Sequence, residues 1–560
     1  MPQDAFHIRR IVAELQNALV GGKVNRISQV DKDELTLIIY TKKTVVKLIV
    51  SANATGARVC LSAHEKEPAP VAPNFCMLLR KHLQNAEIIG IKQYAFERII
   101  EITFHCTGDF SECNRVLYCE LMGKYSNVVL TEKGVILGAL KPTSLQDDFH
   151  RVLLSGARYA YPAPQDKIAI SDGAGMERMA KMFIETYGNN YEEETLAKYL
   201  FERVSGLALP TAREIARRFG AQSMPLHTFV KTFCEDEPCV PYLSIVGGEY
   251  ADFFAFPVAG GKATASLCEA EDAFYYNRES KKGFADKKRK LEAGVRTLKK
   301  KAGKRLQDIL ERIAEAERAE ENRIKGELLT ANLYRLERGA KSVELENWYE
   351  DGQPLMKIAL DSLLTPAQNA QRYFKLYAKQ KRALEILVPM RAKEEAELVY
   401  ADSVFCAIAV ADEAEDLKEI ETELIEAGLL RAPKAKVGAK KKEIPVPFRE
   451  FTCEGFTVLV GRNNVQNDRL LRTASGEDIW LHTQKYHSAH AIIVTNGKRV
   501  PDSVIGCVAQ ICAYYSDGRD GGKIPVDYCK RKYVKKPNKS RAGFVTYTDY
   551  KTVLVEGKLP

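Results

Sequence analysis

The chain has 560 residues, 45% of them hydrophobic and 28% charged, which is enough for several domains of roughly 100–200 residues each. No apolar run approaches the roughly 18 residues of a membrane-spanning helix, and MPQDAFHIRR lacks the apolar core of a signal peptide. The thirteen cysteines follow no regular spacing, so we expect a cytoplasmic protein with reduced thiols, and we expect no membrane partner. The net charge of +9 is modest for this length, so its distribution matters more than its sum.

Residues 1–170 predict an α+β domain that is rich in strands. A helix from Ile8 to Leu19 follows Asp4, a residue type that caps helix N-termini. A second helix, Pro73 to Leu83, carries Arg80 and Lys81 on one turn. Six short apolar runs have the length and composition of strands: Leu35–Tyr40, Thr44–Val50, Arg58–Leu61, Ile99–Phe104, Val116–Glu120 and Asn127–Thr131.

Residues 171–275 predict a helical domain followed by short strands. Its segment RVSGLALPTAREIARRFG places a glycine-containing turn before a helix with proline near its start. Such a segment is either an ordinary helix hairpin or a turn whose following helix N-terminus binds a backbone phosphate. The sequence leaves both interpretations open.

Residues 276–431 predict a long antiparallel coiled-coil arm. In Lys281 to Arg338, apolar residues recur every three or four positions from Leu291 to Ala316, while most other positions are charged. A helix of this length measures on the order of 80 Å. The return stretch begins near Pro366 and continues through Ala392 to Arg431, with a compact tip near residues 340–365.

Residues 432–447 read as a linker rich in lysine and proline, and residues 448–560 as a small α+β domain. This last domain contains seven basic residues within twelve, with no acidic residue among them. We call this segment, Lys530–Arg541, the basic run, and it indicates a phosphate-binding patch more than a solvated loop. Its members are Lys530, Arg531, Lys532, Lys535, Lys536, Lys539 and Arg541.

Three further residues of this domain, Trp480, His482 and His490, read as a nucleic-acid-facing surface with the tryptophan packed beneath it. A metal site is not expected, because the two histidines are eight positions apart without a suitable acidic partner. The chain also lacks a GxxxxGK[ST] phosphate loop and a GxSxG elbow. We therefore expect no catalytic residue, no cofactor and no enzyme activity of its own.

Several long motifs resemble the NFACT family. They are MPQDAFHIRRIVAELQNAL, PNFCMLLRKHL, FERII, ELMGKYSNVVL and the Gly156–Tyr159–Pro162 segment, then LTPAQNAQRYFKLYAKQKRA, VGRNNVQNDRLLRTASGEDIWLHTQKYHSAH and IPVDYCKRKYVKKP. They occur in the family's order and span nearly the whole chain. The resemblance implies a glycosylase-like N-terminal domain, a helix-hairpin-helix-like domain, a coiled-coil arm and an RNA-binding C-terminal domain.

The resemblance also implies a function in ribosome-associated quality control. Family members bind large ribosomal subunits obstructed by peptidyl-tRNA, recruit alanyl-tRNA and promote template-free alanine tailing; a small accessory RNA-binding factor is a further expected partner. Glu97 and Arg98 correspond to the family's usual Asp-Arg pair for tRNA recognition, and Asp4 to an acidic residue of the same surface. Arg80 and Lys81 are either phosphate contacts or solvated helix residues. This chain departs from the family at Glu97 and at Ser488-Ala489, where Gly-Ser is usual.

Four alternatives stay open. Glu97-Arg98 could be only an ion pair at a strand edge, and Asp4 only a helix cap. An older name for the family suggests a fibronectin-binding surface adhesin, which would need an export signal that the sequence does not show. Pro2 invites comparison with DNA glycosylases that use an N-terminal proline, but Gln3 replaces their glutamate and zinc-finger cysteines are lacking.

Overall fold

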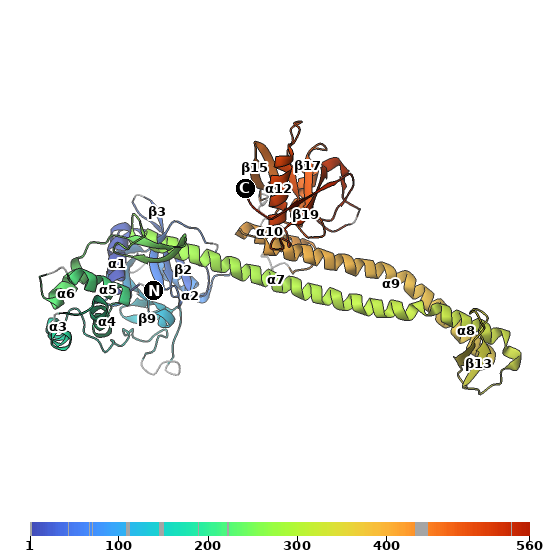
Figure 1. The fold of residues 1–560 in the computed structure, drawn as a ribbon. Coiled ribbons are helices and arrows are strands. Elements are labelled where there is room, and N and C mark those ends of the chain that lie inside the picture. Colours follow the sequence, from blue (N-terminus) through green and yellow to red (C-terminus); the bar gives the residue numbers. More distant parts are fainter. Residues whose placement is uncertain are drawn as a thin grey trace. The chain divides into compact units, whose positions relative to one another are not determined.

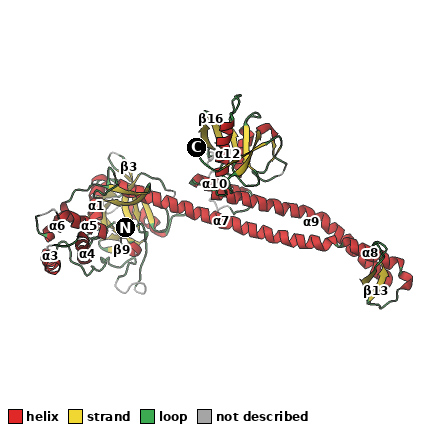
Figure 2. Cartoon of the chain, in the orientation of Figure 1, coloured by secondary structure: helices red, strands yellow, loops and turns green. Residues whose placement is uncertain are grey.

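The computed structural model describes residues 3–42, 44–66, 68–69, 71–107, 112–144, 151–188, 190–220, 223–431, 446–538 and 540–560. Pro2, Lys539 and nearly all of the predicted linker 432–447 lie outside this set. The chain divides into two compact units, Met1–Lys281 (unit 1) and Lys282–Pro560 (unit 2), which combine strands and helices (Figures 1 and 2). None of the helices in the described ranges is both long and apolar enough to cross a membrane. All thirteen cysteines are free thiols.

Unit 1 is built on a nine-stranded antiparallel sheet in the order β4-β3-β2-β1-β5-β6-β7-β8-β9. The six predicted strands are present, and the sheet contains three more, β1, β5 and β9, that the sequence did not predict. The bounds are β1 Lys23–Gln29, β2 Glu34–Tyr40, β3 Val45–Ser51, β4 Arg58–Ser62, β5 Glu87–Gln93, β6 Ile99–Thr107, β7 Glu112–Glu120, β8 Asn127–Glu132 and β9 Val135–Ala139.

Helix α1 (Ala5–Leu19) packs on this sheet through an apolar face that includes Ile8, Ile11 and Leu15. Helix α2 (Asn74–Leu83) also packs against the sheet. Four helices follow, α3 (Gly173–Tyr187), α4 (Glu193–Arg203), α5 (Leu209–Phe219) and α6 (Leu226–Asp236), and then a small sheet of β10 (Tyr242–Val246), β11 (Glu249–Phe254) and β12 (Lys262–Ala263). The predicted segments 1–170 and 171–275 share one hydrophobic core, because Phe183 and Phe233 join the same buried cluster as α1.

A buried carboxyl lies in this shared core. Glu271 stands near the start of α7 (Leu267–Glu317) and is fully buried. One oxygen accepts a hydrogen bond from Gln3, whereas the other has no partner within the described residues. Burial raises the pKa of Glu271 to about 8, despite the nearby guanidinium of Arg58, which lowers it. Glu271 is therefore largely protonated in the folded protein at neutral pH.

This carboxyl should make the stability of unit 1 depend on pH. Because the folded-state pKa lies above the unfolded value, stability is fully present below about pH 4.5 and falls as pH rises through 8. The slope amounts to about 1.4 kcal/mol per pH unit in the free energy of unfolding. Glu271→Gln should remove this part of the decline in the free energy of unfolding, which denaturant unfolding measures between pH 5 and 8. Glu269→Gln, an exposed carboxyl on the same helix turn, serves as the control; equal slopes for both variants would contradict the assignment.

Unit 2 begins with two long helices that lie side by side. Ile309 and Ile313 of α7 form an apolar cluster with Leu387 of α9 (Pro366–Ala409). Ion pairs accompany it: Arg305 binds Glu394 at 2.9 Å and Lys299 binds Asp402 at 2.6 Å. Rising residue numbers on α7 thus pair with falling numbers on α9, so the helices are antiparallel. Between them lie α8 (Ala319–Ala331) and a hairpin of β13 (Ser342–Glu346) and β14 (Leu355–Ala359).

The helix bounds differ from the prediction at both ends. Helix α7 begins at Leu267 rather than Lys281, since the intervening residues contain neither proline nor glycine, so the predicted boundary at 275 falls inside a helix. It ends at Glu317, where a short break precedes α8. The return stretch is likewise broken after Ala409, and a separate helix α10 (Ala414–Glu426) follows.

The chain ends in a six-stranded antiparallel sheet with the order β15-β16-β18-β17-β19-β22. Helix α12 (Asp502–Tyr514) packs on one face, where Leu481 and Ile493 are buried, and α11 (Asn464–Thr473) supplies Leu470 to the core of the other, around Trp480. The strands are β15 Arg449–Cys453, β16 Phe456–Val460, β17 Ile479–Thr483, β18 Ala491–Ile493, β19 Ile524–Lys530 and β22 Lys551–Val555, beside a small pair of β20 Val534–Lys535 and β21 Thr546–Tyr547.

Ion pairs join the C-terminal sheet to the first turn of α10. The fully buried carboxylate of Asp416 binds Arg449 at 2.7 Å through one oxygen and Arg462 at 2.8 Å through the other. Loss of either guanidinium would leave a buried carboxylate with an uncompensated charge. These ion pairs therefore link the sheet to α10.

Candidate nucleic-acid interface

Three segments of unit 1 that are distant in sequence meet at the N-terminus of α1. Asp4 caps this helix: one carboxylate oxygen accepts from the backbone N–H of His7 at 3.1 Å and lies 2.9 Å from its Nδ1. The other oxygen accepts from the backbone N–H of Ala208 at 2.9 Å, just before α5. Asp4 is buried and caps the helix, so the capping interpretation is confirmed, and this carboxylate positions the segments around it. Its place on a surface that recognises tRNA stays a prediction.

Glu97 and Arg98 lie in the turn between β5 and β6, next to this cap. The carboxylate of Glu97 accepts a hydrogen bond from the hydroxyl of Ser205 at 2.9 Å, in the connection between α4 and α5. Both residues are described, and no ion pair joins them. The guanidinium of Arg98 makes no hydrogen bond or ion pair within the described part of the chain, and the side chain is half-buried. The alternative of a simple strand-edge ion pair is therefore wrong.

Gly206 brings the connection between α4 and α5 close to this turn. Its φ of +81° belongs to the left-handed region that favours glycine. A Cβ at this position would lie 2.5 Å from the carbonyl oxygen of Phe96 and 2.8 Å from the Cβ of Ala5. The glycine carbonyl accepts from the backbone N–H of Ala5 at 2.8 Å. Close backbone approach thus places Ser205 beside Glu97.

Arg80 and Lys81 lie on α2 and are not joined to this group by any contact found in the described ranges. Arg80 is half-buried, and its Nε donates to the carbonyl oxygen of Ile27 at 2.7 Å, so part of the guanidinium serves the fold. Lys81 is exposed. Both alternatives, phosphate contact and solvated residue, stay predictions for Lys81.

The basic run of unit 2 is partly neutralised by acidic residues from elsewhere in the chain. Lys530 and Lys532 bind the two oxygens of Glu477 at 2.7 and 2.8 Å. Lys536 pairs with Asp468, and Arg541 with Glu397 on α9. Arg531 donates to the carbonyl oxygen of Leu471 at 2.7 Å. Among the members that the structure describes, the side chain of exposed Lys535 has no hydrogen-bond or ion-pair partner.

Glu477 should therefore control how strongly the basic run binds phosphate. Its two lysines hold the pKa of this exposed carboxyl down at about 2, so it is negatively charged at any physiological pH. Glu477→Gln would free both lysines, and the plot of log K against log salt should become steeper by about 0.7–0.9 per additional phosphate contact.

The measurement is fluorescence anisotropy of a labelled single-stranded RNA over a range of salt concentrations. Glu450→Gln is the matched control, because it removes the same charge from an exposed carboxyl that pairs with no lysine among the described residues. A salt slope that stays at the wild-type value for Glu477→Gln would show that the basic run does not bind phosphate.

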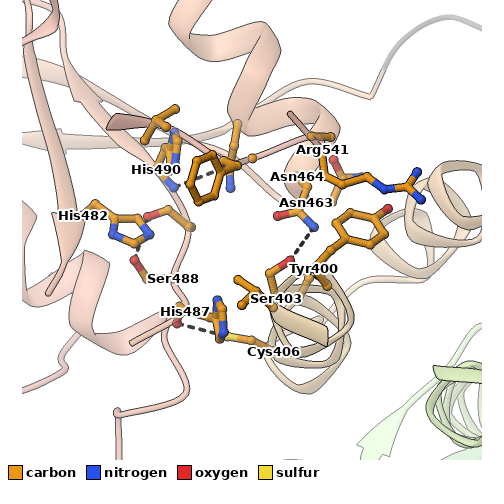
Figure 3. A pocket seen from close by; sticks show the side chains of 18 of the residues that line it. Tyr400, Ser403, Cys406, Asn463, Asn464, His482, His487, Ser488, His490 and Arg541 are labelled. Carbon is orange, nitrogen blue, oxygen red and sulfur yellow. Dashed lines mark hydrogen bonds between the residues drawn. The ribbon is translucent and has the colours of Figure 1, made fainter. Parts of the chain in front are cut away.

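His482 and His490 lie together beside Trp480. Trp480 is fully buried and His490 is nearly so, and a contact of these residues with RNA stays a prediction. The tryptophan ring is parallel to that of His482, with 5.7 Å between the ring centres, and the two histidine rings are perpendicular at 5.3 Å. In Figure 3 both histidines lie with Ser488, across from Tyr400 and Ser403 of α9.

Burial keeps both imidazoles neutral. It lowers the pKa of His482 to about 4 and that of His490 well below its ordinary value. Neutral imidazole offers one donor and one acceptor nitrogen, and no charge. Among the described residues, no cluster of three or more histidine, cysteine, aspartate or glutamate side chains is arranged to hold a metal ion.

Two family models cover most of the chain. The model described as NFACT N-terminal and middle domains matches residues 4–443, and the model described as NFACT protein RNA binding domain matches residues 446–546. The chain belongs to the NFACT family. The resemblance noted in the sequence motifs is thereby confirmed.

Relatives of this NFACT chain include a protein of nearly the same length. Over 99% of the chain and 98% of the relative, it is 33% identical to the Rqc2 homolog RqcH of Bacillus subtilis (strain 168). Human ribosome quality control complex subunit NEMF is 30% identical over 28% of this chain and 14% of that protein. The solved N-terminal part of the fibronectin/fibrinogen-binding protein from Streptococcus suis is 27% identical, with a TM-score of 0.43, over 49% of this chain and 99% of that one.

Several residues of this NFACT chain's candidate interface were not singled out in the sequence. Ser205 and Gly206 stood only within the helix-hairpin segment, and nothing in the pattern linked them to Glu97. The acidic partners of the basic run are likewise distant, with Glu477 lying 53 residues before Lys530. The position of α9 against His482 and His490 carried no sequence signal either.

Proposed function

We propose that this protein is a cytoplasmic factor of ribosome-associated quality control. It binds large ribosomal subunits obstructed by peptidyl-tRNA, recruits alanyl-tRNA and promotes template-free C-terminal alanine tailing, which marks the stalled chain for proteolysis. The observation that carries the proposal is the 33% identity to an Rqc2 homolog RqcH over 99% of this chain and 98% of that protein. An RNA-binding domain at residues 446–546 supports the same role.

In this proposal the protein is not an enzyme. Peptide-bond formation belongs to the ribosome, and the protein supplies binding and orientation. The turn of Glu97 and Arg98, fixed by Asp4, Ser205 and Gly206, is the part of unit 1 that recognises tRNA. The guanidinium of Arg98, which has no partner among the described residues, suits this task, because its planar set of donors can form two parallel hydrogen bonds to a phosphate or a base edge.

The remaining contacts to the ribosome belong to unit 2. Helices α7 and α9 form a coiled-coil arm that carries the hairpin of β13 and β14 to its site, and the basic run adds contacts to ribosomal RNA. A small accessory RNA-binding quality-control factor is a further partner in this proposal. Ribosomal proteins and RNA of the large subunit together provide most of the affinity.

The test uses cells that lack the protein and carry a reporter whose translation stalls. Expression of the full chain should restore C-terminal alanine tails, detected by mass spectrometry of the reporter, and the tagged chain should sediment with large subunits together with one enriched tRNA. Absence of tails together with absence of subunit association would refute the proposal. Recovery of the protein at the cell surface rather than with ribosomes would favour the adhesin alternative.

A further inference from the structure

Unit 2 contains a cavity of about 850 Å³ that the proposed function does not yet use (Figure 3). It lies between the C-terminal half of α9 and the end of β17 with the connection to β18, where His482 and His490 stand. The start of α11, with Asn463 and Asn464, and residues 540–547 complete its walls. A volume of this size is typical of sites for small molecules or parts of larger ligands.

The inner wall of the cavity carries a polar atom without a partner. His490 is 1% exposed, and its Nδ1 makes no hydrogen bond to the described residues. Its backbone N–H donates to the side-chain oxygen of Asn467 at 3.1 Å, which fixes the residue against α11. Leaving a buried polar atom unpaired costs free energy, which a ligand with a matching group would recover. Because the imidazole is neutral, it presents no charge for the ligand to balance, and an uncharged donor or acceptor is sufficient to pair with it.

Five aromatic side chains line the cavity beside the two histidines, which favours a planar ligand. Flat rings are the usual partners of nucleobases in single-stranded RNA, since every base presents a π face. Tyr400 stands on the α9 side in Figure 3, and Phe544, which also lines the cavity, is half-exposed. The aromatic lining residues are Tyr400, Tyr486, Tyr515, Phe544 and Tyr547.

The rim of the cavity is positively charged. Exposed Lys393 and Lys485 line it and have no ion pair in the described ranges. Arg541 also lines it, bound to Glu397 and 5.4 Å from the ring centre of Tyr400. Since the free cations stand at the rim and the neutral imidazoles inside, a ligand with an outer phosphate and an inner uncharged ring matches this distribution.

We propose that this cavity receives one unpaired nucleobase of an RNA strand, with the base between the aromatic walls and against His490, and its phosphates at Lys393 and Lys485. The proposal deepens the proposed function, on which it rests, by naming the ligand of the RNA-binding domain at this site. Stem nucleotides do not fit, because a paired base cannot leave its stack without loss of pairing. The cavity therefore selects loops, bulges or ends.

The experiment uses the full chain and a short single-stranded RNA with 2-aminopurine at its centre. Stacking in the cavity should quench the fluorescence of this base, and an RNA with one abasic site at the same position should bind about 5- to 150-fold more weakly. Phe544→Ala, at a half-exposed side chain, and His490→Phe, which keeps a ring but loses its nitrogens, should both remove the preference for the intact RNA. Tyr40→Ala changes an exposed aromatic side chain of unit 1 and should retain it.

Three outcomes decide the matter. Equal binding of intact and abasic RNA by the wild type, or an unchanged preference in both cavity variants, would overturn the proposal. If adenosine monophosphate, at a concentration equal to that of the RNA, displaces the RNA, the cavity binds a free nucleotide instead of an RNA strand. Co-sedimentation with large subunits is measured alongside: loss of sedimentation with a retained base preference would refute the proposed function and leave the cavity assignment standing.

Discussion

Replacing Arg98 with alanine should abolish tRNA selection and alanine tailing, while association with large ribosomal subunits stays largely intact. The guanidinium has no partner within the described residues, so its removal costs the fold little. Loss of one bidentate arginine contact removes about 1–3 kcal/mol of discrimination, roughly a 5- to 150-fold preference. Such a loss is small beside a contact with the ribosome at many points, but it is large for the choice of one tRNA among many.

The measurement is subunit co-sedimentation, carried out beside sequencing of the tRNA that purifies with each variant. Glu97→Ala should weaken selection as well, because the hydrogen bond from Ser205 that fixes the turn is lost. Glu97→Asp restores the residue usual in the family and should be nearly silent. If Arg98→Ala together with Glu97→Ala still enriches the same tRNA and supports tails, the recognition site lies elsewhere.

An exposed arginine in the same unit provides a matched control. Arg213 lies on α5 and pairs with Glu194 at 2.8 Å in a solvated ion pair, which contributes little to stability. Arg213→Ala removes the same charge and side chain and should leave the tRNA profile unchanged. Parallel loss of selection in both arginine variants would indicate a general effect of positive charge rather than a site at Arg98.

The sequence was sufficient to predict a helix or strand wherever its local hydrophobic pattern agrees with the burial of its residues in the fold. Helix α1 follows from an apolar face at Ile8, Ile11 and Leu15, and all of these are buried. Strand β1, with the sequence KVNRISQ, was missed because polar and charged residues occupy most of its positions and only Val24 and Ile27 mark its buried side. Its place in the middle of the sheet depends on pairing with β2 and β5, which a single segment cannot reveal.

The candidate sites could be predicted only in part, for a similar reason. Motifs identified Glu97, Arg98 and the basic run as functional, but the charge of the run depends on partners 53 to 144 residues away in the chain. His490 gave no sign that it borders a cavity, because the opposite wall comes from α9. Residues whose role depends on contacts across such distances need the folded structure.

Gly206→Ala should destabilise unit 1 and also move the residues of the proposed tRNA-recognition site apart. The added Cβ would lie 2.5 Å from the carbonyl oxygen of Phe96, so backbone must move, and the φ of +81° adds strain. Overpacking of this kind lowers the free energy of unfolding by about 1–3 kcal/mol. The strain of a non-glycine residue in the left-handed conformation adds to this loss. Moving the loop would also break the hydrogen bond between Ser205 and Glu97.

The control is Gly134→Ala, at the tip of the hairpin between β8 and β9. Its φ of +79° is nearly the same, but an added Cβ would meet no atom within 4 Å. Denaturant unfolding should therefore show a smaller loss for Gly134→Ala, equal to the conformational strain alone, and its tRNA profile should match the wild type. Equal losses of stability in the two variants would mean that close approach at Gly206 contributes nothing. Retained tRNA selection in Gly206→Ala would mean that Ser205 does not position Glu97, because the loop that carries it cannot stay in place once the Cβ is added.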